Sequence, residues 1–415
     1  MPTIIVIGAG PAGMMAAGKA ARLGCKATLM EKNNRLGKKL AITGKGRCNV
    51  TNDTDVPSLV KNIPGNGRFL YSALTAFSSQ DLQQFFQEQG VSLKVERGNR
   101  VFPCSDSSFD IVDGLRRYLQ QNRVDIRLGQ RVEKLLMENN RVRGVVANGE
   151  TFPSDAVIIC TGGASYPATG STGDGYRLAA EAGHTIVPPR PALVPLETAE
   201  KWPRELTGLA LRNVQLTLLQ GEKSLGNEFG EMLFTHYGIS GPIVLTLSRY
   251  VTHSKNTQAV IASINLKPAL TLEQLDLRLQ RDLRQNQRKE IKNALHKLLP
   301  KKLIPVVIAE AGIEETKPAH QITRAERHRL IQILTDLRLT IVGPRPLSEA
   351  IVTAGGVSTK EIDPKTMQSK LVDGLYLAGE VIDVDGYTGG FNLQAAFSSG
   401  YLAGRSAATQ CLQAR

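Results

Sequence analysis

The chain has 415 residues, 41% of them hydrophobic, and a formal net charge of +13 at pH 7. This length favours two or three domains, and no apolar run reaches the roughly 20 residues of a membrane span, so we expect neither membrane association nor a signal peptide. Five dispersed cysteines without a CxxC pair and six scattered histidines argue against a disulfide framework and a metal site, and favour the reducing cytoplasm.

The first predicted element is a nucleotide-binding turn. A β-branched strand, Ile4–Ile7, runs into GAGPAG, and a helix of small residues follows. The glycines that permit the tight turn, the approach to a pyrophosphate and close helix packing are Gly8, Gly10 and Gly13. The next strand, Ala27–Met30, ends on Glu31, which can accept hydrogen bonds from both ribose hydroxyls of adenosine. This spacing predicts a site for the ADP part of FAD or NAD rather than an ordinary βα turn with incidental glycines.

The first 190 residues alternate between strands and helices, as in an α/β domain. Helices are predicted over Ser79–Gln89 and Phe109–Gln121. The predicted strands of this region are Val124–Leu128, Val132–Met137, Arg141–Val146 and Ala156–Cys160. Thr161 and Gly162 follow the last strand, and the prolines at residues 188–195 predict a domain boundary.

Residues 191–345 differ in character and are predicted to form an inserted domain. The alternating stretches Leu209–Leu219 and Gln258–Leu266 indicate a β-rich module over about residues 191–268. Helical spacing follows in Leu270–Leu303 and in Ile322–Leu339, which predicts a helical module over about residues 270–340. Residues 346–415 return to the α/β pattern and are predicted to complete the first domain, residues 1–190.

A second nucleotide motif lies near the C-terminus. The strand Leu375–Ala378 leads into Gly379 and Glu380, and a glycine-rich loop and a helix over Gly390–Ala408 follow. This unit resembles the one with which glutathione-reductase-like flavoproteins contact the ribityl chain and pyrophosphate of FAD. A helix N-terminus beside the flavin stabilises an anionic reduced ring by about 0.3–2 kcal/mol. Because FAD is long enough to need both motifs, the pair favours FAD over NAD.

Residues 35–52, RLGKKLAITGKGRCNVTN, form a basic, glycine-rich loop suited to wrapping phosphates or a flavin. Together with IGAGPAGMMAA, LFTHYGISGPIVL and LYLAGEVIDVDGYTGGFNLQAAFSSG, this loop resembles the BaiN/RdsA-like family of flavoproteins over nearly the whole chain. The resemblance implies non-covalent FAD, redox activity linked to NADH or NADPH, and a Rossmann-like FAD-binding domain with an inserted β-rich module and a helical module. Family members are assigned to ribosomal RNA dihydrouridine synthesis and to bile-acid metabolism, so the resemblance leaves the substrate open.

The resemblance also assigns cofactor-binding positions, residue by residue. The positions expected at the ADP half of FAD are Gly8, Gly10, Ala12, Gly13, Glu31 and Lys32. The positions expected at the flavin half are Gly379, Glu380, Asp383, Gly390, Phe391 and Asn392. Further positions expected over or beside the cofactor are Lys39, Gly46, Arg47, Thr161 and Gly162. Because the chain has no second GxGxxG motif, NADH or NADPH is expected to dock only transiently.

Reduction of a C=C bond such as uracil C5=C6 needs a proton donor beside the flavin. The first candidate is Cys48, with Arg47 and Asn49 beside it, and all three are expected near the isoalloxazine. An adjacent cation is expected to lower the pKa of the thiol, which favours thiolate over acid. The alternative is a cysteine that only packs beside the loop. Cys104 and His236 are weaker candidates, each with a packing or surface role as the alternative.

The sequence favours an FAD-dependent oxidoreductase that uses NAD(P)H to reduce a C=C bond, with a uridine in ribosomal RNA as the first substrate hypothesis. Nine basic residues between Arg278 and Lys302 are opposed by two acids, so the basic helices 271–302 either contact RNA phosphates or form a solvated face. The low aromatic content, 5%, favours structured RNA over an open strand. The alternative functions are a reductase of a small enone or steroid-like molecule, and a non-catalytic flavin- and RNA-binding assembly factor.

Overall fold

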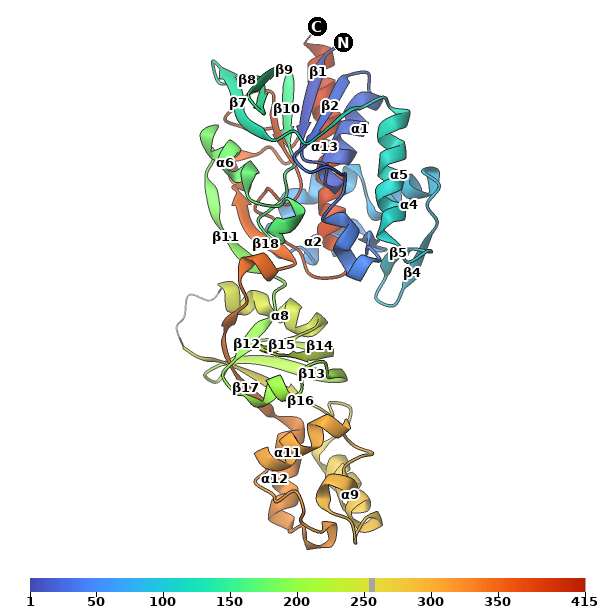
Figure 1. Ribbon diagram of the computed structural model, residues 1–415, viewed down its shortest axis with the longest axis vertical. Helices are drawn as coiled ribbons and strands as arrows, with labels where there is room; N and C mark the ends of the chain where they lie inside the picture. The colour runs from blue at the N-terminus through green and yellow to red at the C-terminus, as the bar shows by residue number, and fades with distance from the viewer. Residues whose placement is uncertain (254–257, 415) are drawn as a thin grey trace. The chain divides into compact units, whose positions relative to one another are not determined.

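The computed structural model describes residues 1–253 and 258–414, which form two compact units. Unit 1 combines Met1–Ala192 with the chain from Leu347 onward, and unit 2 is Leu193–Pro346. The chain therefore begins unit 1, builds all of unit 2, and then returns to complete unit 1 (Figure 1). Among these described residues, no helix is both long and apolar enough to span a bilayer.

The main sheet of unit 1 has five parallel strands in a doubly wound order. From one edge to the other they are β19 (Leu375–Leu377), β10 (Ala156–Ile159), β1 (Thr3–Ile7), β2 (Lys26–Glu31) and β6 (Asp125–Leu128). The strand order reverses between β1 and β10, and in such sheets a ligand binds outside the carboxyl ends of the strands at this reversal. The predicted Rossmann-like α/β fold is confirmed, and both glycine motifs follow strands of this sheet.

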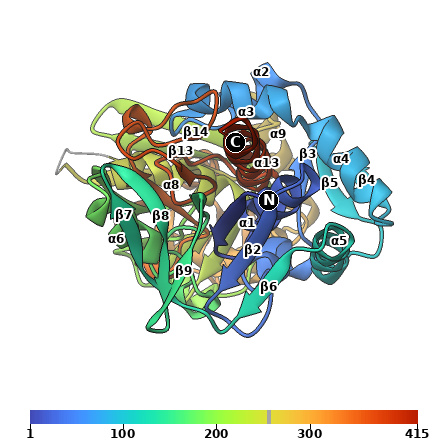
Figure 2. The same ribbon diagram turned by 90° about the horizontal axis from the view of Figure 1, so that it is seen from above.

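Two helices of small residues, α1 (Pro11–Arg22) and α13 (Phe391–Gln413), lie side by side in unit 1 (Figures 1 and 2). A Cβ atom on Gly400 or Gly404 of α13 would lie 2.3 Å from the carbonyl oxygen of Ala12 or Ala16 of α1, respectively. These glycines are therefore required for the close approach of the two helix backbones. The contact joins the first motif of the chain to the last.

Smaller elements surround this core. Three further sheets of unit 1 are β3 (Thr51–Asn52) with β5 (Arg100–Pro103) and β4 (Leu93–Glu96), β7 (Val132–Glu138) with β8 (Arg141–Ala147) and β9 (Glu150–Pro153), and β11 (Ile186–Ala192) with β18 (Val352–Val357). The other α-helices of unit 1 are α2 (Val56–Lys61), α3 (Tyr71–Ala76), α4 (Ser79–Glu88), α5 (Ser108–Gln121) and α6 (Asp174–Glu181). The predicted helices at 79–89 and 109–121 are confirmed.

The proline-rich segment before unit 2 is a strand. Strand β11 contains three prolines yet pairs antiparallel with β18, with an irregular register between Val187 and Arg190. Proline lacks the N–H group that donates hydrogen bonds to a neighbouring strand. Strand β11 tolerates its prolines because, in the described part of the chain, it pairs with one strand only and its pairing is interrupted. The unit boundary follows directly after β11, between Ala192 and Leu193.

Unit 2 contains a closed six-stranded barrel. In order around the barrel the strands are β12 (Leu196–Thr198), β15 (Gly238–Ser240), β14 (Lys223–Thr235), β13 (Ala210–Gln220), β16 (Val260–Asn265) and β17 (Leu337–Pro344). Two helices, α7 (Trp202–Glu205) and α8 (Pro242–His253), lie in the connections. Pairing of β17 with both β16 and β12 closes the barrel.

Four more α-helices of unit 2 form one insertion between β16 and β17. They are α9 (Leu272–Gln285), α10 (Ile291–Ala294), α11 (Ile304–Glu310) and α12 (Arg324–Thr335). The predicted helix over Ile322–Leu339 is wrong at its C-terminal end, because Leu337, Leu339 and Ile341 alternate with more exposed residues in β17 and are buried in the barrel. At this point the spacing of the apolar residues changes from a repeat of 3.6 residues, typical of a helix, to a repeat of two, typical of a strand. The helical spacing of the leucines before it makes the change hard to recognise in the sequence.

Shortly after the C-terminal end of α6, a buried histidine makes contacts with two later segments of unit 1. His184 is 4% exposed, with Nε2 2.8 Å from Ser369 Oγ and Nδ1 3.3 Å from Glu361 Oε2. Ser369 Oγ already accepts hydrogen bonds from the backbone N–H groups of Leu371 and Val372. Its proton therefore points to Nε2, and the neutral imidazole carries its own proton on Nδ1 toward Glu361.

Unfolding of the protein is expected to become easier as the pH falls below about 6.5, the ordinary pKa of histidine. Burial lowers the pKa of His184, and Glu361 opposes this effect only in part. The unfolded chain therefore binds a proton that the folded chain excludes until the pH reaches the lower folded pKa. Denaturant titrations over this range, compared between wild type and His184→Gln, isolate the effect, and identical pH slopes would contradict it.

Candidate functional site

The GxGxxG turn has the geometry that a pyrophosphate site needs. Gly8 has a φ of 100°, and a Cβ atom on Gly13 would lie only 1.8 Å from the Gly8 carbonyl oxygen. A Cβ atom on Gly10 would meet no atom within 4 Å in the described part of the chain, its own neighbours aside. Gly10 begins α1 without a side-chain cap from the described residues, so helix N–H groups face open space.

Glu31, at the end of β2, holds this turn together. It is 9% exposed, and its Oε2 accepts the backbone N–H of Ala9 at 2.7 Å. Its Oε1 accepts the backbone N–H and the side-chain amide of Asn33, at 2.8 and 2.7 Å. A carboxylate offers about four lone-pair sites, and these contacts occupy three of them. One site remains, on Oε2, so with these contacts in place Glu31 can accept from one ribose hydroxyl, whereas the sequence predicts that it accepts from both.

The C-terminal motif meets the first motif at Ala12. A Cβ atom on Gly379, which follows β19 with a φ of 79°, would lie 2.9 Å from the Ala12 Cβ. The backbone N–H of Gly379 donates to Ser399 Oγ of α13 at 3.0 Å. Ala12 and Gly379, more than 360 positions apart in the sequence, therefore form one wall of the candidate cofactor site.

The loop after β2 is tied to the same wall by Lys39. Its ammonium lies 2.8 Å from Glu380 Oε2 and 2.7 Å from Ser165 Oγ. Glu380 Oε1 also accepts the backbone N–H of Thr353, from β18, at 2.8 Å. Sequence reasoning had identified Lys39 and Glu380 but missed Ser165 and Thr353. Ser165 lies in the glycine-rich stretch after β10, whereas Thr353 carries no local sequence signal.

The N-terminus of α13 packs on the end of the loop 35–52. Gly390 has a φ of 98°, and a Cβ atom there would lie 2.3 Å from the backbone of Thr51. Thr51 Oγ1 donates to Gln394 Oε1 at 2.5 Å. Asn392 uses its side chain within its own loop, accepting from the backbone N–H of Gly386 and donating to its carbonyl, both at 2.8 Å. Phe391 is buried beside them.

The loop between Lys39 and Asn49 has an unusual backbone. Three consecutive positions have a positive φ, Gly44 (57°), Lys45 (60°) and Gly46 (85°), and Cys48 (58°) has one two residues later. A left-handed conformation is uncommon for residues other than glycine, and such strain is maintained only where surrounding structure imposes it. Its concentration in one loop supports a binding role for this segment.

Cys48 is completely buried in the core of unit 1. Burial raises the pKa of its thiol to about 12, with a smaller opposing effect of a hydrogen bond to Thr43. The expected lowering of this pKa by Arg47 is therefore wrong, because desolvation dominates. The thiol stays protonated at neutral pH, which is the form that a proton donor needs.

The guanidinium of Arg47 points away from that thiol into a surface ion network. It lies 2.5 Å from Glu96 and 2.6 Å from Asp106, and it stacks over the ring of Phe102 at 4.2 Å. Lys94 joins the network 2.9 Å from Asp106. These contacts connect the loop to the β4–β5 hairpin, so the Arg47 side chain has a structural role here, and its part in catalysis stays a prediction.

The structure also places three other residues that the sequence predicts near the site or the substrate: Lys32, Cys104 and His236. The ammonium of Lys32 lies 2.6 Å from Asp174 at the start of α6. Cys104 is exposed in the segment after β5. His236 is exposed in the turn between β14 and β15, with its ring 4.7 Å from that of Tyr237. For these residues a role at the site stays a prediction.

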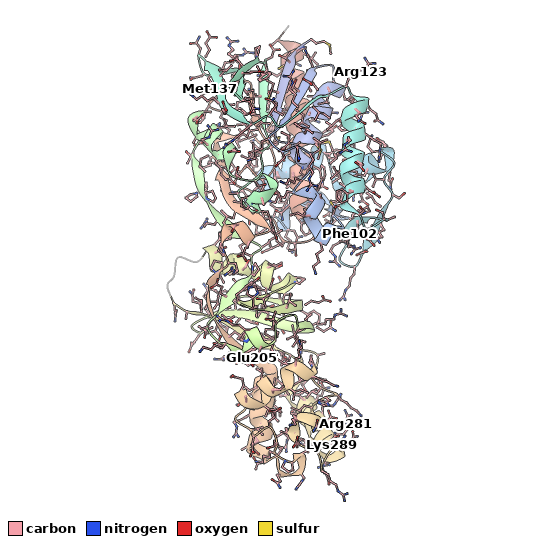
Figure 3. The ribbon with its side chains drawn as sticks, viewed as in Figure 1. Phe102, Arg123, Met137, Glu205, Arg281 and Lys289 are labelled. Atoms are coloured by element: carbon pink, nitrogen blue, oxygen red, sulfur yellow. The ribbon has the colours of Figure 1, made fainter. Side chains whose placement is uncertain are left out.

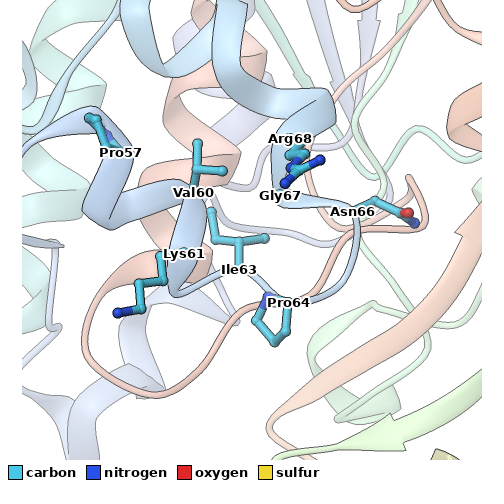
Figure 4. A pocket seen from close by; sticks show the side chains of 8 residues that line it. All are labelled: Pro57, Val60, Lys61, Ile63, Pro64, Asn66, Gly67 and Arg68. Carbon is cyan, nitrogen blue, oxygen red and sulfur yellow. The ribbon is translucent and has the colours of Figure 1, made fainter.

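An open hollow of about 550 Å³ lies beside the loop that precedes α13 (Figure 4). Its wall includes Asn66, whose amide donates to the carbonyl oxygen of Asp383 at 2.7 Å and to its carboxylate at 3.0 Å. Lys61 and Arg68 contribute two cations to the lining. The hollow thus borders the predicted flavin half, and Asp383 serves to hold its wall.

A family model described as the HI0933-like protein Rossmann domain matches residues 2–406. The chain belongs to this family. A 3-dehydro-bile acid delta(4,6)-reductase from Clostridium scindens is 35% identical over 413 residues, covering 98% of this chain and 99% of that protein. A ribosomal RNA dihydrouridine synthase from Escherichia coli is 34% identical over 397 residues, covering 96% of each chain. The family resemblance inferred from the motifs is confirmed.

Solved flavoenzyme structures share the fold of this HI0933-like chain. A flavocytochrome c3 fumarate reductase in its open conformation has a TM-score of 0.51 at 18% identity, covering 99% of this chain and 78% of the other. A 3-ketosteroid delta1-dehydrogenase from Sterolibacterium denitrificans has a TM-score of 0.51 at 13% identity, covering 99% and 100%. These likenesses show the fold, and the family shows an FAD-binding oxidoreductase.

The residues that are present fit FAD. Gly10 leaves open space in front of a helix N-terminus, and both glycine motifs meet at one wall. Within residues 1–253 and 258–414, the side-chain oxygens of Asn49 and Thr161 are buried without a hydrogen-bond partner, and both were predicted site residues. Such orphaned atoms are rare because each costs about 1–3 kcal/mol, and a bound cofactor can satisfy them. In contrast, the described residues contain no cluster of three metal-ligating side chains.

Proposed function

We propose that this protein takes electrons from NADH or NADPH and reduces the C5=C6 bond of a uridine in ribosomal RNA, forming dihydrouridine. The single observation that favours RNA over a small molecule is the charge of +13, with nine cations against two acids in residues 278–302. Two curated relatives carry the name ribosomal RNA dihydrouridine synthase, at 33% and 34% identity. Polyanionic substrates suit such a chain because phosphate contacts supply most of the affinity.

The overall reaction adds one hydride and one proton to the uracil C=C bond and oxidises one NAD(P)H. FAD, when bound, supplies the hydride-transfer chemistry, and the protein supplies binding, orientation and the proton. The helix N-terminus at Gly10 and the carboxylate of Glu31 would hold the ADP half. The turn at Gly379 and the start of α13 would hold the flavin half. We assign the proton to Cys48 Sγ, which stays protonated at neutral pH but is completely buried, so the thiol has to become accessible before it can protonate the substrate carbon.

A reductase of a small enone or steroid-like molecule is the second candidate. The observation in its favour is the Clostridium scindens relative, named a 3-dehydro-bile acid delta(4,6)-reductase, at 35% identity over nearly the full length of both chains. The two candidates share their flavin chemistry and differ in the recognition surface. Reduction of a neutral enone is expected to be almost independent of salt, whereas activity on RNA falls steeply as salt rises.

Mass-spectrometric mapping of dihydrouridine in ribosomal RNA, with and without the gene, tests the proposal. We expect deletion to remove at least one dihydrouridine, and the wild-type chain to restore it. A variant that combines Gly10→Ala with Glu31→Ala is expected not to restore it, because both changes act on the cofactor site. An unchanged dihydrouridine pattern after deletion would reject RNA as the substrate, and enones would then be assayed with the purified flavoprotein.

A further inference from the structure

We infer that the helical insertion of unit 2 carries a docking surface for the phosphate backbone of folded RNA. Six exposed cations make up this surface, which we term the insertion surface: Arg284, Arg288, Lys289, Lys297, Lys301 and Lys302. The inference rests on the proposed function, because it names how the substrate of that reaction is held. It goes beyond that function by separating the residues that bind RNA from those that bind the cofactor.

The structure divides the nine cations of residues 278–302 into two groups. Arg278 and Arg281 lie 2.7 and 3.5 Å from the carboxylate of Asp282, which is 3% exposed. Lys292 lies 3.0 Å from Glu290. Each of these three cations thus has an acidic partner, although Arg278 and Arg281 share the single charge of Asp282. The six cations of the insertion surface have no ion pair with any residue that the structure describes.

The six cations belong to one folded region rather than a loose tail. The apolar side of α9 is buried through Leu275, Leu279 and Leu283, which share a core with Ile291 and Leu295. The guanidinium of Arg278 reaches the carbonyl oxygen of Lys297 at 3.5 Å, which joins the middle of α9 to the segment that carries the later lysines. Figure 3 labels Arg281 and Lys289 in this insertion. Packing of the leucines therefore directs the polar side of the region outward.

The chemistry of the insertion surface fits phosphates on a folded RNA. Residues 271–302 contain no Phe, Tyr or Trp, so the surface lacks the stacking platform that single strands require. Cations without aromatic partners bind the backbone and carry no base sequence information. A basic amphipathic helix on a membrane needs a continuous free apolar side, whereas three of the five leucines of α9 lie in the core and only Leu272 and Leu277 are exposed. Helical RNA, recognised by shape and phosphates, remains the matching partner.

The experiment compares two triple variants of the full chain with the same net charge. The first, Arg284→Gln, Arg288→Gln and Lys289→Gln, removes half of the insertion surface. The matched control, Lys26→Gln, Arg123→Asn and Lys134→Gln, removes three exposed cations of unit 1 that have no recorded ion pair among the described residues. Asparagine suits position 123 because Arg123 has a φ of 54°. The probe is deproteinised ribosomal RNA, with binding measured at several salt concentrations.

We expect the first variant to lose about three units of the slope of log K against log salt, since each lost phosphate contact lowers the slope by about 1. The control is expected to bind as wild type, and FAD content and flavin reduction by NADPH are expected to be equal in all three proteins. Wild-type binding by the first variant, or equal weakening of both variants, would overturn the inference. Selective loss of binding without any dihydrouridine formation by wild type would reject the proposed function but leave the surface intact.

Discussion

Replacing Gly10 by alanine is expected to weaken FAD binding by about 1–3 kcal/mol, or about 5- to 150-fold, without destabilising the apoprotein. A Cβ atom at this position meets no described atom within 4 Å beyond its chain neighbours, and its φ of −81° is open to any residue. The new methyl group therefore occupies only the space that a pyrophosphate would use. Flavin fluorescence titration of the apoprotein measures the affinity, and chemical denaturation measures the stability.

Gly343→Ala is the matched control for this experiment. Gly343 also has no described atom within 4 Å of a built Cβ, but it lies in β17 of unit 2. It should retain wild-type FAD affinity and stability. An alanine at Gly10 that binds FAD as tightly as wild type would show that the pyrophosphate does not approach the N-terminus of α1.

Replacing Cys48 by alanine is expected to slow substrate reduction by about 100- to 10,000-fold, the usual contribution of a general acid. Reduction of the flavin by NAD(P)H needs no proton donor at the substrate, so this half-reaction should keep its wild-type rate. Because burial raises the pKa of the thiol to about 12, the wild-type rate should show no thiol titration near neutral pH. Rapid-mixing measurements of the two half-reactions separate these effects.

Cys25→Ala provides the control for the loss of a buried thiol. Cys25 is 3% exposed and lies in the same core as Cys48, but it follows α1 rather than preceding β3. Its variant should reduce the substrate normally. Equal rates for Cys48→Ala and wild type would assign Cys48 a packing role and leave the proton donor to another group.

Motifs with local geometry could be recognised in the sequence. Gly8, Gly10 and Gly13 are defined by backbone angles and close contacts over six residues, so their spacing alone predicts the turn. The helices at 79–88 and 108–121 begin at Ser78 and Ser107, whose side chains accept hydrogen bonds from the first helical turn. Such caps and periodic apolar residues act within one segment.

Contacts between distant segments could not be predicted in this way. The partners of Arg47, Glu96 and Asp106, lie 49 and 59 positions later, and no local pattern links them. The adjacency of Arg47 and Cys48 in the sequence predicts that the cation lowers the pKa of the thiol. In the structure the guanidinium instead contacts the β4–β5 hairpin, and burial determines the pKa of Cys48. Strand β17 likewise became a strand because β12 and β16 pair with it.

The sequence by itself determined the two glycine motifs, the Rossmann-like fold and the family, because each depends on short-range backbone geometry and on recognisable segments. Tertiary structure alone decided which side chains meet. It joined Lys39 to Glu380 across 341 positions, buried the Cys48 thiol, and left six of nine cations of the helical insertion without an acidic partner in the described structure. Burial and charge pairing depend on neighbours from the whole fold, and those neighbours are not encoded in any one segment.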